Sequence, residues 1–154
     1  MIRTILIALA AILITTLGYG QRVKTYANEV SAYDGGTTES GTLWIQGSGY
    51  GKKPEVARLD AEKAIFRHLL FQGIPGTTYN LPMVPDESIS KRDHAAFYTG
   101  FFEKGGYREF IMTSSTSTLI KVDGNKRMDV QMKVNVNALR AHLEKNEIMR
   151  KFGL

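Results

Sequence analysis

The chain of 154 residues contains no cysteine and only three histidines. Without cysteine it forms no disulfide, offers no thiolate ligand to a metal ion and has no residue for a cysteine-linked lipid anchor. A domain made from this sequence must therefore be held together by its hydrophobic core.

Long hydrophobic runs are also scarce. The one example runs from Ile5 to Ile14, and its apolar character ends at about Leu17. A helix that spans a bilayer needs about 20 apolar residues. The run has instead the length of the hydrophobic part of a signal peptide.

The residues around this run fit the same interpretation. Arg3 supplies a positive charge before it, and Gly18 and Gly20 place small side chains where a signal peptidase requires them. We therefore expect residues 1–20 to be a signal peptide that is cleaved before Gln21, and the mature protein to be periplasmic or secreted. The alternative interpretation is an uncleaved membrane anchor.

The charge is mildly positive, +5 from 20 basic and 15 acidic residues. The basic residues are scattered, apart from the pairs Lys52-Lys53, Lys91-Arg92 and Arg150-Lys151. Nucleic-acid binding normally needs a concentrated basic surface. We expect no nucleic-acid partner.

The chain after the signal peptide is long enough for one domain. Residues 21–40 are polar with weak alternation and predict an N-terminal arm or lead-in strand, and residues 41–154 predict a single α+β domain. The first strand expected in it is Thr42–Gln46, which is rich in β-branched and aromatic side chains.

A helix is expected from Pro54 to Gln72, because proline suits a first helical turn and Gly73 follows as a stop. One face of this helix is a narrow stripe made mainly of alanines, whose small side chains would let the helix approach a sheet closely. That stripe consists of Ala57, Ala61, Ala64 and His68, and the opposite stripe consists of Leu59, Phe66 and Leu70. Apolar residues on two sides predict cover on two sides.

An aromatic helix is expected next. Ser90 and Asp93 have the spacing of a capping box, and Gly105-Gly106 would end the helix. Its apolar face contains His94, Phe97, Tyr98 and Phe101. These side chains, with Phe102, predict the cover for the first helix, and the alternative is an exposed aromatic surface for a partner or glycan.

The C-terminal part predicts a long antiparallel hairpin followed by a helix. Arg108–Val122 forms its first arm, and Asp123-Gly124-Asn125 forms its turn. The second arm alternates without fault from Met128 to Val136. Asn137 is expected to cap the final helix, whose apolar residues are Leu139, His142 and Leu143.

The strand that ends in Gly47-Ser48-Gly49, followed by the alanine-spaced helix, resembles the small bacterial envelope domains of the flagella-associated lipoprotein type. The expected hairpin and final helix fit the same layout. The resemblance implies an envelope protein without catalytic residues that acts by contact with other components. This chain lacks the family's lipid-bearing cysteine, and the proline-rich loop Gly73–Pro85 with the aromatic helix Ser90–Lys104 looks like an insertion. Flagellar association is therefore not implied.

The glycine-rich turn before the first helix is the candidate ligand site. Its members are Gly47, Gly49, Gly51, Lys52 and Lys53. Glycines allow close backbone approach, and helix N-termini attract anions. The spacing matches neither the P-loop nor the dinucleotide motif, so a structural bulge or turn is the competing interpretation.

The remaining candidates give no catalytic signature. His68, His94 and His142 could bind zinc only if three helices converged, and their spacing gives no metal motif, so we expect neither metal nor cofactor. The hydroxyl-rich run Thr113–Thr118 contains no nucleophile elbow. At a sheet edge it could pair with a partner strand, whereas elsewhere it would be a solvated strand.

The sequence thus predicts an exported, non-enzymatic envelope domain that acts by protein contact through a sheet edge or as a structural accessory. The alternative is a domain that binds a small anion or ligand at the Gly47–Lys53 turn.

Overall fold

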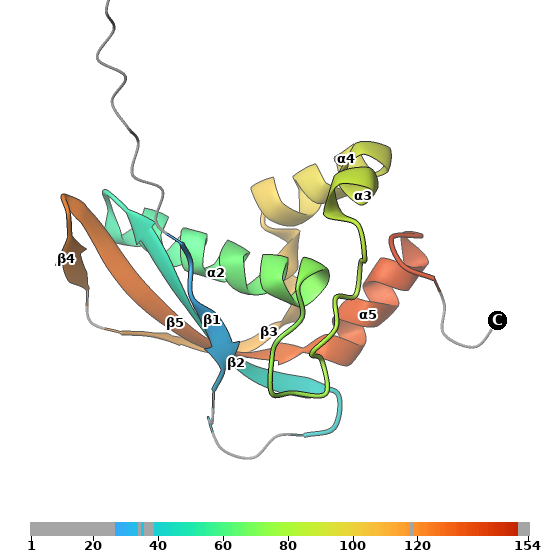
Figure 1. Cartoon of the computed structure of the whole chain (residues 1–154), viewed down its shortest axis with the longest axis horizontal. Helices are drawn as coiled ribbons and strands as arrows, with labels where there is room; N and C mark the ends of the chain where they lie inside the picture. The colour runs from blue at the N-terminus through green and yellow to red at the C-terminus, as the bar shows by residue number, and fades with distance from the viewer. Residues whose placement is uncertain (1–26, 34, 36–38, 118, 151–154) are drawn as a thin grey trace, which may run out of the picture.

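The computed structural model describes residues 27–33, 35, 39–117 and 119–150. The predicted signal peptide and residues 21–26 of the predicted arm lie outside this part. The fold is α+β, as expected: helices pack on an antiparallel sheet (Figure 1). None of the helices in these ranges is long and apolar enough to cross a membrane.

The described strands form one five-stranded antiparallel sheet. Along the sheet the order is β1 (Val30–Ala32), β2 (Thr42–Gly51), β5 (Asn125–Asn135) and β3 (Ile111–Thr116). The short strand β4 (Ile120–Val122) also pairs with β5, beyond the end of β3. β5 is therefore the central strand, with β2 along one side and β3 and β4 along the other.

The predicted hairpin is present, with a tighter turn and a more broken first arm. Val122 pairs with Asn125, so only Asp123 and Gly124 form the turn, and both have positive φ, 46° and 82°. This is the backbone of a type I′ turn. The prediction of a continuous first arm from Arg108 was wrong, because Gly106–Phe110 is a short 3₁₀-helix, η2, and β3 and β4 are separate strands.

The alternation of β5 is confirmed, since Val130, Met132 and Val134 are all fully buried. Its end differs from the prediction. The strand stops at Asn135, and the helix α5 (Val136–Lys145) begins one residue later. Asn135, rather than Asn137, caps it, with its side chain accepting a hydrogen bond of 2.9 Å from the Ala138 N–H.

Helix α2 (Pro54–Phe71) lies along one face of the sheet (Figure 1). Ala57 and Ala61 of this helix are fully buried, so its narrow stripe does face the sheet. A methyl group on Gly49 of β2 would lie 2.2 Å from both the Ala57 carbonyl oxygen and the Ala61 nitrogen. Glycine at this position is therefore what allows the helix and the strand to approach so closely.

The back of α2 is covered by aromatic side chains, as predicted. Phe101 packs edge-on against Phe66 of α2, with ring centroids 5.9 Å apart. Tyr98, Phe101 and Phe102 are all buried. They belong to the core rather than to a broad exposed aromatic surface, although Tyr98 and Phe102 also line a hollow beside α2.

The aromatic segment is broken into three pieces, which are α3 (Glu87–Asp93), α4 (Ala95–Tyr98) and the π-helix η1 (Thr99–Glu103). The capping box predicted at Ser90 and Asp93 was wrong. Asp86 caps α3 by accepting a hydrogen bond from the Ile89 N–H.

The two residues of that predicted box have other partners. The hydroxyls of Ser90 and Tyr98 are hydrogen-bonded at 2.6 Å, and Asp93 binds the guanidinium of Arg92. The helical stretch breaks at His94, which is both the C-cap of α3 and the N-cap of α4.

Candidate functional site

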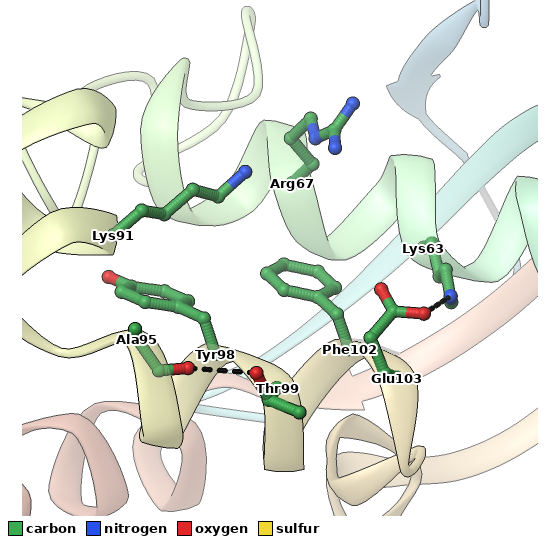
Figure 2. A pocket seen from close by; sticks show the side chains of 8 residues that line it. All are labelled: Lys63, Arg67, Lys91, Ala95, Tyr98, Thr99, Phe102 and Glu103. Atoms are coloured by element: carbon green, nitrogen blue, oxygen red, sulfur yellow. Dashed lines mark hydrogen bonds and ion pairs between the residues drawn. The ribbon is translucent and has the colours of Figure 1, made fainter.

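A hollow of about 240 Å³ lies between α2 and the aromatic segment (Figure 2). Lys63 and Arg67 of α2 line one side, and Lys91 of α3 reaches in from an end. The other walls come from α4 and η1. Three cationic side chains from two separate helices thus surround one hollow.

Two aromatic rings form the apolar wall of this hollow. Tyr98 and Phe102 are nearly parallel, with an interplanar angle of 12° and centroids 6.3 Å apart. Burial raises the pKa of Tyr98, and its neutral hydroxyl is hydrogen-bonded to that of Ser90. The wall is therefore uncharged, and the hydrogen bond to Ser90 holds the Tyr98 ring in place.

The cations around the hollow differ in how firmly they are paired. Lys63 donates a hydrogen bond of 3.0 Å to Glu103, and Lys91 bonds to Glu87 while lying over the Phe102 ring. The Arg67 guanidinium reaches Glu87 only at 3.7 Å, too far for a hydrogen bond. Among the described residues, Arg67 makes no hydrogen bond through its side chain.

The π-helix shapes the lower wall. The Lys104 N–H bonds to the Thr99 carbonyl at 3.1 Å, which is the i to i+5 closure of a π turn. Along this wall Tyr98 lies near Lys91, Glu103 lies beside Lys63, and Phe102 lies between them (Figure 2). Short π segments within helices are frequent at functional sites.

The glycines of the predicted ligand turn serve packing instead. Gly47, Gly49 and Gly51 all face α2, and a methyl group on any of them would collide with it. The amides between them are also occupied, because the Ser48 N–H bonds to the Glu29 carbonyl and the Tyr50 N–H bonds to Asp60. The backbone of Gly47–Gly51 therefore has no free face on which to cradle a phosphate.

The two lysines of that turn are placed differently. Lys52 and Lys53 follow Gly51, whose partner in the sheet is Lys126, and Lys126 is in turn paired with Lys121 of β4. No hydrogen bond or ion pair joins the side chain of any of these four lysines to another described residue. The first turn of α2 lies at the same end of the sheet (Figure 1). We call these four residues the lysine end.

Strand β3 forms one edge of the sheet, since its only described partner is β5. The Ser117 N–H bonds to the Asp129 carbonyl of β5. Because backbone groups along a strand point alternately to either side, this bond establishes which residues of β3 face β5. The backbone groups of Ser114 and Thr116 consequently point away from β5. The side chains after Ile111 are exposed, including Met112 at 49%, beside a bulge in the register.

The three histidines occupy separate environments. His68 contacts the Ala64 carbonyl through Nδ1 at 3.0 Å, whereas His142 packs against the rings of Phe97 and Phe110. His94 lines a wider hollow of about 680 Å³ between α3 and the end of α5. Across the described ranges, no three histidine or carboxylate side chains are grouped as metal ligands would be.

A buried acidic cluster was missed by sequence reasoning. Glu62 of α2 is 2% exposed, and its carboxylate accepts bonds from Tyr107, Arg58 and Arg108. Burial and the bond to Glu62 raise the pKa of Tyr107 to about 12. The one sequence signal was the i, i+4 spacing of Arg58 and Glu62, which any exposed helix also shows.

Comparison of the chain with protein-family models, curated proteins and solved structures finds no match. The functional argument therefore depends on the chain's own residues.

Proposed function

We propose that this protein is an exported, non-enzymatic domain of the cell envelope that binds an extended segment of another protein along β3. The observation on which this depends is the edge position of β3 together with its composition. Its six residues, Ile111–Thr116, include no charged side chain and no proline. Those are the residues with which proteins usually protect an exposed edge from pairing.

The geometry of β3 supports this partner. Ser114 and Thr116 direct their N–H and carbonyl groups outward, and β5 holds the strand in place from behind. An added strand would gain main-chain hydrogen bonds from these groups. The opposite edge is less suitable, since β1 has only three residues.

The test uses photo-crosslinking in the cells that export the protein, with a photoreactive residue in place of the exposed Met112. Ser114→Pro removes an outward N–H from the edge while leaving the bonds to β5, and proline is tolerated on an edge strand. We expect one crosslinked partner that is lost in Ser114→Pro and kept in the matched control Ser114→Ala. A partner that crosslinks equally to both variants would show that backbone pairing is not the contact.

A second copy of the chain is the competing occupant. Pairing of β3 with β3 would give a dimer in analytical ultracentrifugation that Ser114→Pro dissociates. That result would mean that β3 pairs with a second copy of this chain and not with another protein.

The lysine end favours a second candidate function, the binding of a small oxyanion such as phosphate. Lys121 and Lys126 lie directly opposite each other across the β4–β5 pair, and like charges in this position repel. The positive end of the α2 dipole, near Pro54, adds to the same field. A bound anion would relieve this repulsion, with lysine side chains as its contacts in place of the glycine backbone.

Thermal unfolding in phosphate, against sodium chloride at matched ionic strength, tests this candidate. Phosphate is expected to raise the melting temperature of the wild type and to have no specific effect on Lys52→Ala/Lys53→Ala or Lys121→Ala/Lys126→Ala. The matched control is Lys145→Ala, an exposed lysine at the far end of α5. An unchanged phosphate effect in both double variants would exclude the lysine end.

A further inference from the structure

We propose that the hollow between α2 and the aromatic segment is a binding site for small aromatic anions, in which Arg67 holds the oxyanion and the Tyr98–Phe102 wall holds the ring (Figure 2). This site is independent of both the β3 edge and the lysine end. It joins a cationic rim to an apolar wall, so it fits a ligand that has both chemistries.

Arg67 is the anion contact that the geometry favours. Its guanidinium has a planar fork of donors that matches a carboxylate or phosphate group. The side chain makes only the 3.7 Å contact with Glu87, so an incoming oxyanion would not have to displace an existing hydrogen bond. Lys91, which already shares Glu87, lies close enough to add a second positive charge.

The aromatic wall suits a flat apolar group. Tyr98 and Phe102 present two nearly parallel rings side by side, and Lys91 Nζ lies 5.8 Å from the Phe102 centroid. Aromatic rings gain from contact with other rings beyond the area they bury. A simple inorganic anion would use only half of this surface.

The size and charge of the hollow restrict the ligand further. Its volume of about 240 Å³ is below the range usual for drug-sized ligands, which favours a single ring with one anionic group. At the other end, Glu103 is paired with Lys63 and would repel a second anionic group. The site thus selects small aryl carboxylates or aryl phosphates over larger polyanions.

The experiment is a titration of isotope-labelled protein, followed by NMR, with benzoate and phenyl phosphate as probes. We expect saturable shifts at Tyr98, Phe102 and Arg67, and weaker binding of inorganic phosphate and benzyl alcohol, each of which offers one half of the contact. Arg67→Gln is expected to weaken phenyl phosphate binding at least about tenfold, the effect of losing a charged hydrogen-bond partner.

Arg92→Gln is the matched control, because Arg92 is an exposed arginine of α3 outside the hollow. It should bind phenyl phosphate as the wild type does. Arg67 is 58% exposed, so Arg67→Gln should keep the fold, which the same spectra report. Shifts that do not saturate, shifts confined to the lysine end, or equal affinity of Arg67→Gln and the wild type would each overturn the proposal.

Discussion

The hydroxyl of Tyr107 donates a hydrogen bond of 2.9 Å to Oε2 of Glu62, and both side chains are buried. The two residues are 45 positions apart in the sequence. Arg58 and Arg108 bind the same carboxylate from the surface side, where each is almost half exposed. This cluster ties η2 to the back of α2 and balances a buried charge.

Tyr107→Phe should destabilise the protein by about 1–3 kcal/mol at neutral pH, because the buried Glu62 carboxylate loses one donor. It should also change the alkaline behaviour. The pKa of Tyr107 rises from 10.0 to about 12 on folding, so the folded state keeps a proton that the unfolded state releases. The wild type must therefore lose stability as pH rises from 10 to 12.

Urea denaturation of the wild type and Tyr107→Phe between pH 8 and 12 measures this difference. The free energies of unfolding should converge as pH rises, because the variant lacks this titrating group. A constant gap over the whole range would mean that Tyr107 has the same pKa in both states.

Gly49→Ala should destabilise the domain by about 3 kcal/mol or more. The added methyl group would meet backbone atoms of α2 at 2.2 Å, and backbone cannot move aside as a flexible side chain can. Gly100→Ala is the control, since a methyl group there has no neighbour within 4 Å. Equal urea midpoints for the two variants would contradict the close approach of α2 and β2.

Asn135→Ala should cost about 1 kcal/mol, the usual effect of losing an N-cap. Asn137→Ala should cost less than about half of that, because the side chain of Asn137 is exposed and does not cap α5. Chemical denaturation of the two variants compares them directly. The reverse order would restore Asn137 as the cap.

Mass spectrometry of the N-terminus of the protein purified from cells tests whether it is exported. Cleavage of the predicted signal peptide should leave Gln21 as the first residue. Recovery of the chain with Met1, in the membrane fraction, would instead establish an anchored protein and place the domain at a membrane surface.

Local patterns in the sequence predicted most of the elements. The alternation of β5, the glycine stop at Gly73 and the turn at Gly124 depend on neighbouring residues only, and all three were correct. The helix starts were wrong wherever two residues could serve as caps. Asn135 is preferred over Asn137 because β2 begins at Thr42, the register partner of Asn135, so the strand pairing ends there.

The sites were less predictable, because each depends on contacts between distant segments. Sequence reasoning found Lys52 and Lys53, but only the strand register brings Lys121 and Lys126 beside them. Arg67 gave no signal in the sequence, since an exposed arginine on a helix is common. Its significance depends on the π turn, which places Phe102 and Glu103 opposite it.

The central position of β5 also determines when the chain can fold. β2 finds its main partner only after almost the whole chain is present, as the pair Gln46 and Gln131, 85 residues apart, illustrates. Pairings of such long range form slowly, because the loop between them must first be closed. The sheet can therefore close only once residues 125–135 are available, and a fragment that ends before them would leave β2, β3 and β4 without the strand they share.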